Sequence, residues 1–282
     1  MRIALLSDIH ANPLALKAAL DDIRKRRSPD RIISLGDQVN LGPAPRETLS
    51  LLADYGVVCL HGNHERYVLS AMAGDPAYDG ANFSCVRFSA ERLRREEITF
   101  PMTLDMDGVI FCHAMPDDDR FPVWDPEKAL PLLREMTFDR PTHIICGHGH
   151  NPSYIRAGNV TIDCIGAVGC MDDAPAGVTI YTMLTLDRGG AALQPFVVPY
   201  DTRPLKAMFR TSGLAAYCPV MARVACCEMT DNVDYLMPFA ALASRIARER
   251  GETQISRAAL LAADAVFPWP GGVDTADYWR SE

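Results

Sequence analysis

Histidine, aspartate and asparagine side chains gather in five short segments of this 282-residue sequence, and each segment directly follows a short apolar run. Five of the seven histidines lie in these segments, together with two aspartates and one asparagine. Imidazole nitrogens and carboxylate or amide oxygens suit ions such as Mn, Fe, Zn, Ni and Co better than a soft metal. The segments are Asp8-Ile9-His10, Gly36-Asp37, Gly62-Asn63-His64-Glu65, Cys112-His113 and Gly147-His148-Gly149-His150.

Each segment taken alone has an ordinary structural explanation. An Asp-x-His sequence is commonly a turn with a solvated histidine, and a lone histidine such as His113 more often belongs to a core. If these explanations held throughout, five polar segments would each lie at the end of an apolar run by chance. We therefore favour a shared functional site. His61 and His143 lack this placement, because each lies within or just before an apolar run, and we assign them structural roles.

The number of candidate ligands predicts two metal ions rather than one. Even seven of these eight side chains are too many for one tetrahedral ion, but they suit two ions that share a carboxylate. Two cations about 3.5–4 Å apart clamp the oxygens of an in-line phosphoryl displacement. They also lower the pKa of a shared water toward neutrality, so that hydroxide becomes available as a nucleophile.

The apolar runs predict parallel strands that alternate with helices, because continuous runs of this kind are typical of strands covered on both faces. Asn12-Pro13 supplies an N-cap and a first-turn proline, and Ser28-Pro29 ends the helix that follows. Loops at the carboxyl ends of parallel strands converge on one crevice, which would bring the polar segments together. Strands are predicted at residues 2–7, 31–35, 57–60, 109–112 and 142–146, with helices near 45–54 and after His64.

The pattern changes near residue 153, where two hairpins of antiparallel strands are predicted. One lies within residues 154–162, and the other pairs 177–187 with 191–199 across Gly189-Gly190. No linker separates these strands from the first half of the chain, so we predict one domain over residues 1–204. Its predicted fold class is α/β, with two facing mixed β-sheets flanked by helices.

Residues 205–282 are alanine-rich and are predicted to form a helical C-terminal extension. One predicted helix has an apolar face whose members are spaced by three or four residues. The face has two interpretations: it packs on the domain, or it serves as a lid or as the contact of a homo-oligomer with a partner subunit. Its members are Tyr235, Phe239, Leu242 and Ile246.

The polar segments, in their order along the chain, resemble the motifs of the calcineurin-like metallophosphoesterase superfamily. The similarity is greatest to its small bacterial phosphoesterases and covers roughly residues 1–200. The residues that carry it are Asp8-Ile9-His10-Ala11-Asn12, Leu14-Ala15-Leu16, Gly36-Asp37-Gln38-Val39-Asn40-Leu41-Gly42-Pro43, Gly62-Asn63-His64-Glu65, His113 and Gly147-His148-Gly149-His150.

This resemblance implies a βαβαβ sandwich and a centre of two divalent or trivalent metal ions. It also implies hydrolysis of a phosphomonoester or phosphodiester by a metal-bridging hydroxide. His64 would contact a phosphoryl oxygen or protonate the leaving alkoxide, a role that suits a histidine near its neutral pKa. The implied ligands are Asp8, His10, Asp37 and His150 for one ion and Asp37, Asn63, His113 and His148 for the other, with Asp37 as the bridge.

Three positions depart from the patterns of the superfamily. Asn40 and Leu41 stand where its phosphoprotein phosphatases have an aspartate and an arginine, and leucine cannot clamp a phosphate. Asn40 can still hydrogen-bond His64. Gly149 replaces a common threonine or serine, with little effect expected on the metals. Cys164-Ile165-Gly166-Ala167 replaces an Asn-Pro-Gly-Ser sequence that borders the site in relatives, so the resemblance does not indicate the substrate.

The charge of the chain argues against some partners. Asp and Glu number 36 and Lys and Arg 28, which gives a formal net charge of −8. A surface that coats nucleic acid needs clustered positive charge, so nucleic acid is disfavoured and a small phosphoester substrate is favoured. A nuclease and a non-catalytic interaction scaffold on the same fold stay open as alternatives.

Other features of the sequence indicate a cytoplasmic protein without a membrane segment. No apolar run approaches the ~18 residues of a membrane helix, and the first residues do not follow a signal-peptide pattern. The nine cysteines are odd in number and include no C-x-x-C pair, which is typical of free thiols in a reducing compartment. We expect Asp117-Asp118-Asp119 to be a solvated acidic loop rather than a third metal site.

Overall fold

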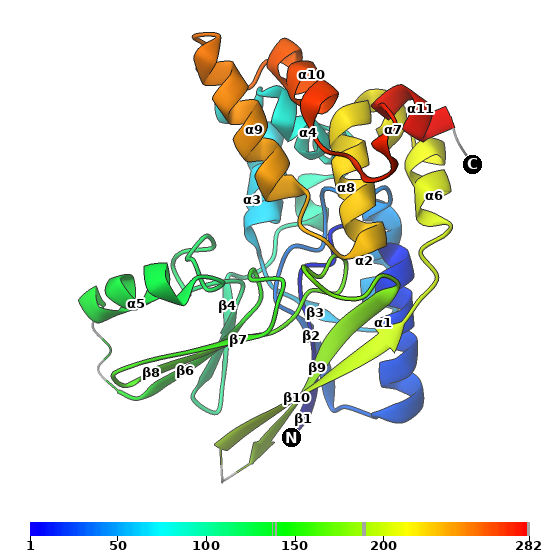
Figure 1. Ribbon diagram of the computed structural model, residues 1–282. Coiled ribbons are helices and arrows are strands. Elements are labelled where there is room, and N and C mark those ends of the chain that lie inside the picture. Colours follow the sequence, from blue (N-terminus) through cyan, green and yellow to red (C-terminus); the bar gives the residue numbers. More distant parts are fainter. Residues whose placement is uncertain (137, 139, 188–189, 281–282) are drawn as a thin grey trace.

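Short apolar runs form the strands of two five-stranded sheets in the computed structural model of the chain (Figure 1). The structure describes residues 1–136, 138, 140–187 and 190–280. In β1 (Arg2–Leu6) the last four of the five residues are buried, because other elements cover both faces of the strand. The predicted α/β fold class, with two mixed sheets flanked by helices, is confirmed.

The first sheet has the strand order β10-β9-β1-β2-β3. β1 pairs in parallel with β2 (Arg31–Ser34), which pairs in parallel with β3 (Val58–Cys59). β9 (Val178–Asp187) runs antiparallel to β1 and pairs along its length with β10 (Gly190–Pro199). The predicted pairing of these two segments is confirmed, although Gly189 of the predicted turn lies outside the described residues.

The second sheet has the strand order β4-β5-β6-β8-β7. Its three central strands are parallel to one another, and its two edge strands are antiparallel to their neighbours. The hairpin predicted within residues 154–162 is formed by β7 and β8, whereas β4 is an element that the apolar pattern did not indicate. The bounds are Thr103–Met106 for β4, Val109–Cys112 for β5, Thr142–Cys146 for β6, Ser153–Ala157 for β7 and Val160–Cys164 for β8.

The two sheets face each other across a core and carry helices on their outer faces. Leu5 of β1 packs in one cluster with Phe111 and Ile145 of the second sheet. The next residue, Leu6, packs with Leu16 of a flanking helix, as the alternation of side chains along a strand requires. The flanking helices are α1 (Pro13–Arg26) and α2 (Pro45–Asp54) on the first sheet and α5 (Pro126–Glu135) on the second.

Capping residues set where two of these helices begin. The side chain of Asn12 accepts the N–H of Ala15 at 3.2 Å, with proline at the first helical position, as predicted for α1. Helix α5 was not predicted, yet Asp125 precedes a proline in the same way and accepts the N–H of Lys128. The start of α5 therefore carries a signal that is visible in the sequence.

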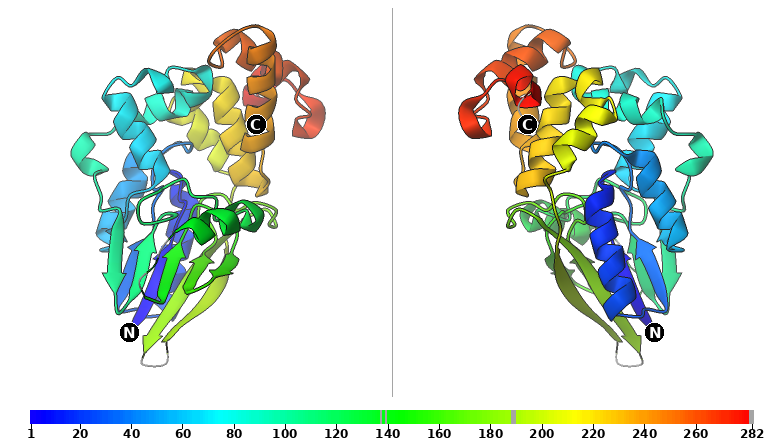
Figure 2. Two further views of the ribbon diagram at one scale, coloured as in Figure 1. Left: turned by 90° about the vertical axis from the view of Figure 1, so that its left-hand side faces the viewer. Right: turned by 90° about the vertical axis from the view of Figure 1, so that its right-hand side faces the viewer.

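Helices make up the described chain from residue 205 to Arg280, as predicted, and residues 281 and 282 lie outside the description. Figure 2 shows them over the end of the sheets at which β1 ends. None of the described helices is both long and apolar enough to cross a membrane. The helices are α6 (Leu205–Thr211), α7 (Leu214–Tyr217), α8 (Pro219–Asp231), α9 (Leu236–Glu249), α10 (Arg257–Val266) and α11 (Thr275–Arg280); earlier in the chain lie α3 (Asn63–Met72) and α4 (Ser84–Ala90).

The C-terminal helices share a hydrophobic cluster with the first part of the chain. Leu41 and Phe88 pack in this cluster with Phe209, Val224 and Phe239. The predicted apolar face of α9 lies against the same cluster. Its other members, Tyr235, Leu242 and Ile246, are partly buried there. The division of the chain at residue 204 and an association between copies both stay predictions.

We expect Phe239→Ala to lower the free energy of unfolding by about 3–5 kcal/mol. The ring of Phe239 is fully buried, with its centroid 5.2 Å from that of Phe267 and 5.6 Å from that of Trp269, so truncation leaves a cavity. Urea denaturation measures the change. Met237→Ala is the matched control, because Met237 lies on the same helix and is 64% exposed. Equal unfolding midpoints for the two variants would contradict the packing described.

Candidate metal centre

The structure brings all seven predicted ligand residues together where the parallel strands of both sheets end. β1, β2 and β3 are parallel to one another, as are β5 and β6, and each of these strands is followed by a loop that carries a polar segment. The residues are Asp8 and His10 after β1, Asp37 after β2, Asn63 after β3, His113 after β5, and His148 and His150 after β6.

Asp37 lies at the centre of this group. Its Oδ2 is 3.3 Å from Nε2 of His113, 3.9 Å from Nε2 of His64 and 4.0 Å from Nε2 of His10. This carboxylate belongs to two sets of potential ligand atoms. Within each set, all atoms lie within 4.8 Å of one another. One set is Asp37 with His10 and His64, and the other is Asp37 with His113 and His148. A carboxylate shared by two sets of ligands is the arrangement expected of a bridging residue.

Asp8 holds the other carboxylate of the group. Its Oδ1 is 3.8 Å from Nε2 of His150 and 3.9 Å from Nε2 of His113. Its Oδ2 accepts the backbone N–H of His148 at 2.9 Å, which ties the loop after β6 to the loop after β1. One oxygen of Asp8 therefore fixes the two loops, and the other faces the ligand nitrogens.

His113 is oriented so that one ring nitrogen faces the centre. Its Nδ1 donates to the carbonyl oxygen of Leu35 at 3.1 Å, and its Nε2 lies 2.9 Å from Oδ1 of Asn63, which accepts from Nε2 when the ring is protonated. Burial opposes protonation of this ring, but the carboxylates of Asp37 and Asp8 outweigh burial and raise the pKa of His113 to about 9. The space between these atoms thus favours positive charge, which a metal cation supplies.

Several buried atoms that could ligate a metal ion have no hydrogen-bond partner in the described part of the chain. They include Oδ1 of Asp8 and Nε2 of His148. Buried polar atoms are almost always paired, so orphaned ones call for an explanation. Burial lowers the pKa of His148 to about 2, so its ring is neutral and its lone pair is free to ligate. This donor set fits metal cations.

Five of the candidate ligands have a left-handed backbone, which side chains other than glycine rarely adopt. Such strain costs on the order of 1–3 kcal/mol per residue and gathers at functional sites. Glycines provide the close approach that the strained loops need: a Cβ at Gly62 would overlap the carboxylate of Asp37, and one at Gly147 would overlap the hydroxyl of Ser7. The φ angles are 52° at Asp8, 50° at His10, 57° at Asp37, 66° at His148 and 55° at His150.

His64, the predicted catalytic residue, lies beside the ligands at the start of α3. Its backbone N–H donates to Oδ1 of Asp37 at 2.8 Å, and its ring centroid is 4.7 Å from that of His10. Nδ2 of Asn40 donates to its Nδ1 at 2.8 Å, so Asn40 makes the hydrogen bond expected of it. Burial lowers the pKa of His64, which favours the neutral ring.

The role of Glu65 was not identified from the sequence. This carboxylate is fully buried and accepts four backbone N–H groups, two on each oxygen. The donors are Asp37, Gln38 and Val39 of the loop after β2, at 2.9, 2.9 and 3.2 Å, and Gly62 at 2.9 Å. A glutamate three residues after the N-cap Gly62 is a capping-box signal that the sequence does show.

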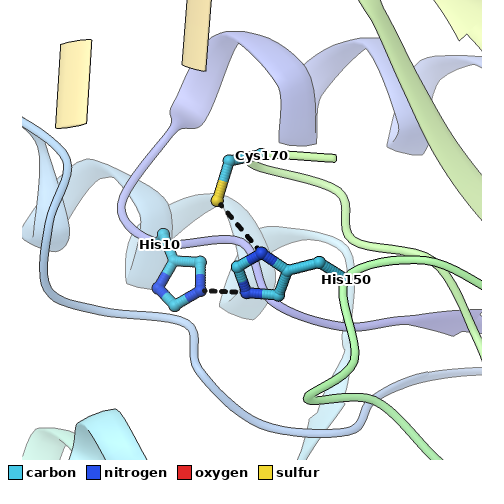
Figure 3. A group of neighbouring side chains, drawn as sticks. All are labelled: His10, His150 and Cys170. Carbon is cyan, nitrogen blue, oxygen red and sulfur yellow. Dashed lines mark hydrogen bonds between the residues drawn. The ribbon is translucent and has the colours of Figure 1, made fainter. Parts of the chain in front are cut away.

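Three further residues near His150 were also not singled out as site residues. Figure 3 shows the His150 ring between His10 and the thiol of Cys170, whose Sγ is 3.9 Å from Nδ1 of His150. Burial raises the pKa of Cys170 to about 12, so the thiol stays protonated. Asp172 and Glu228 also lie beside this ring. All three follow β8 or come from α8, in segments whose pattern indicated no site.

The expectation of a solvated loop at residues 117–119 is wrong for one of its three aspartates. Asp117 and Asp118 are exposed, but Asp119 is 6% exposed and receives Nε and Nη2 of Arg66 at 2.7 and 2.9 Å. An arginine that reaches from α3 buries this carboxylate in a two-point ion pair. His143 lies apart from the centre and pairs with Asp163 at 2.6 Å, and His61 is in neither set of ligand atoms.

Comparison with protein families gives a match over more than half of the chain. The sequence model described as calcineurin-like phosphoesterase matches residues 1–168. A solved metallophosphoesterase from Sphaerobacter thermophilus is similar in structure, with a TM-score of 0.60 and 25% identity over 76% of this chain and 95% of that one. The hypothetical protein PH1004 from Pyrococcus horikoshii OT3 has the same fold, with a TM-score of 0.60, 16% identity and coverage of 82% and 98%.

Two curated proteins are similar in sequence over part of their length. The uncharacterized protein MJ0912 of Methanocaldococcus jannaschii is 31% identical over 53% of this chain and 63% of its own length. A symmetrical bis(5'-nucleosyl)-tetraphosphatase of Aromatoleum aromaticum is 30% identical over 48% of this chain and 50% of its own. The chain thus matches about half to two thirds of the length of these relatives.

We expect Glu65→Gln to destabilise the metal-free protein by about 1–3 kcal/mol. An amide has one acceptor oxygen, so its NH₂ group would face one of the two pairs of backbone donors that Glu65 now binds. Thermal denaturation in chelator measures the loss. Glu249→Gln is the control, because Glu249 is exposed and its replacement should change stability by less than about 0.5 kcal/mol. Equal melting temperatures would show that Glu65 does not organise the loop.

Proposed function

The chain belongs to the calcineurin-like phosphoesterase family, and we propose that it is a dinuclear metal-dependent phosphoesterase that hydrolyses a phosphomonoester or phosphodiester. The observation that carries the proposal is the convergence of seven candidate ligand side chains around Asp37, whose carboxylate lies within 4.8 Å of ring nitrogens of His10, His113 and His148. Buried donor atoms without partners support the same conclusion.

The proposed ligands divide between two cations that share Asp37. When bound, two such cations neutralise charge on phosphoryl oxygens and lower the pKa of a shared water. The protein's part is to hold the ligands in place, through the strained loops at the ends of the strands. Asp8, His10, Asp37 and His150 would hold one cation, and Asp37, Asn63, His113 and His148 the other.

His64 would act on the substrate rather than on a metal. Because Asn40 donates to its Nδ1, the neutral ring carries its proton on Nε2, the atom that faces Asp37. This N–H is placed to donate a hydrogen bond to a phosphoryl oxygen. If the Asn40 amide turns over, its Oδ1, which has no partner in the described chain, can accept from Nδ1–H of an imidazolium, and Nε2 can then protonate the leaving oxygen.

The substrate we propose is a small phosphoester. Leu41, which stands where phosphoprotein phosphatases have a phosphate-binding arginine, is 6% exposed and packs in the cluster with the C-terminal helices. The position is therefore part of a core and supplies no phosphate clamp. The tetraphosphatase relative supports the cleavage of a phosphate bond in general. It does not indicate the same substrate, because the similarity spans half of its length. The formal charge of −8 argues against a long polyanion such as nucleic acid.

We expect the purified protein to contain about two metal ions per chain and to hydrolyse aryl or bis-aryl phosphate until a chelator is added. Asp37→Asn should lose both metal and activity, because the bridging carboxylate loses its charge. Asp54→Asn is the control, since Asp54 is exposed on α2. Mass spectrometry measures the metal content, and the release of nitrophenol from a nitrophenyl phosphate ester measures the activity. Bound metal without hydrolysis of any ester would favour the interaction scaffold, and preferred cleavage of polynucleotides would favour a nuclease.

We expect His64→Ala to keep the metal ions and to lower kcat by about 10²- to 10⁴-fold. Steady-state rates with an aryl and an alkyl phosphate separate the two roles of His64. Loss of a proton donor affects the alkyl ester more, because its leaving oxygen is more basic, whereas loss of a phosphoryl contact affects both esters alike. His64→Gln keeps an N–H donor. It should retain more activity than His64→Ala only if His64 contacts a phosphoryl oxygen and does not protonate the leaving oxygen. A fully active His64→Ala protein would exclude both roles.

A further inference from the structure

His150 faces the candidate metal centre with one ring nitrogen and a separate group of side chains with the other (Figure 3). Its Nε2 lies 3.3 Å from Nε2 of His10 and 3.8 Å from Oδ1 of Asp8. Its Nδ1 lies 3.6 Å from Oδ2 of Asp172 and 3.9 Å from Sγ of Cys170. Nε2 is therefore the metal-facing atom, and Nδ1 points toward acidic groups.

Glu228 of α8 belongs to the group around Nδ1. One oxygen of Glu228, one oxygen of Asp172 and a ring nitrogen of His150 lie within 4.8 Å of one another. Glu228 is 3% exposed, and in the part of the chain that is described no lysine or arginine forms an ion pair with it. Oδ1 of Asp172 is also buried and has no hydrogen-bond partner among the described residues. One imidazole thus faces two carboxyl groups.

Buried polar atoms need hydrogen-bond partners, and an imidazole N–H is one that both carboxyl groups can reach. A histidine that ligates a metal almost always donates its other ring N–H to a carboxylate, which fixes the ring and makes it a stronger ligand. We propose that Asp172 and Glu228 are positioning residues that hold the proton of His150 on Nδ1. Nε2 is then left free for the metal. The C-terminal helices thereby become part of the metal centre, an inference that rests on the proposed function.

The end of α8 is fixed in a way that keeps Glu228 in this place. Asn232, at φ 54°, ends the helix, and its side-chain amide donates to the carbonyl oxygens of Pro175 and Val178 at 2.8 and 3.0 Å. The hydroxyl of Tyr200 donates to the carbonyl oxygen of Met229 at 3.0 Å. The Asn232 bonds join the last turn of α8 to the segment that follows Asp172, and the Tyr200 bond joins it to the residue after β10. Glu228, one turn before Asn232, is consequently held against His150.

The test compares Mn²⁺ binding to the metal-free full chain and to the variants Glu228→Gln and Asp172→Asn, by calorimetry and by competition with a chelating dye. We expect each variant to bind one of two Mn²⁺ equivalents about 10- to 100-fold more weakly and the other as in the parent protein. Glu228→Asp, which keeps a carboxyl group, should recover part of the loss. The control is Asp264→Ala, which removes the side-chain acceptor of Trp269 and Thr275 within the C-terminal helices but does not touch the centre.

Stability without metal distinguishes positioning from a merely structural role. Burial raises the pKa of Glu228 and so disfavours its charged form, and Glu228→Gln is neutral. The metal-free variant should therefore melt at the same or a higher temperature, while the stabilisation gained from Mn²⁺ falls. Unchanged Mn²⁺ affinity in both variants would overturn the inference. A weaker Mn²⁺ affinity that comes with a lower metal-free melting temperature, as expected of the control variant, would overturn it too. A third Mn²⁺ equivalent that is lost with Glu228 would also overturn it, in favour of a separate cation site. If Glu228→Gln does not fold, Asp172→Asn alone decides. A parent protein that binds no Mn²⁺ would instead refute the proposed function.

Discussion

The buried carboxylate of Asp37 is the group on which the rest of the site depends. It is 1% exposed, and rings from three different loops face it within 4.0 Å. A buried carboxylate costs several kcal/mol unless neighbouring groups compensate it. Those neighbours come from the loops after β1, β3 and β5, so compensation requires that both sheets place their loops correctly at once. Glu65 adds to this constraint, because it holds the backbone of the loop after β2 to the residue that precedes α3.

The strained ligand loops explain why a site of this kind needs so large a framework. Each candidate ligand residue with a left-handed backbone destabilises the folded state, and the contacts next to it do not offset this cost. Burial of apolar side chains elsewhere offsets it: β1 is covered on both faces, and the sheets enclose a core of aliphatic and aromatic side chains. The C-terminal helices extend the same support on the side of His150 through the cluster that contains Leu41 and Cys170. The candidate ligands are therefore held in place by packing that lies outside the site.

Local patterns in the sequence predicted most of the fold and the residues that gather at the strand ends. A strand run followed by Asp-x-His or Gly-Asp is a local signal, and the rule that parallel strands end at a common edge converts it into proximity. The residues around Nδ1 of His150 have no such signal, because Glu228 reaches the ring from a helix far along the chain. Asp119 was misjudged for a similar reason: its partner Arg66 lies on a helix after a different strand. Pairings between distant segments depend on the packing of the whole chain, which periodicity does not describe.

The position of β1 in its sheet has a consequence for biosynthesis. Residues 2–5 of β1 pair with residues 182–185 of β9, so one edge of β1 is completed by a strand that is made much later. At about 5–20 residues per second, translation takes on the order of ten seconds or more to supply that partner. Until then β1 has β2 on one side and an open row of backbone groups on the other. The nascent chain thus passes through a stage in which an apolar strand edge is open to chaperones and to neighbouring chains.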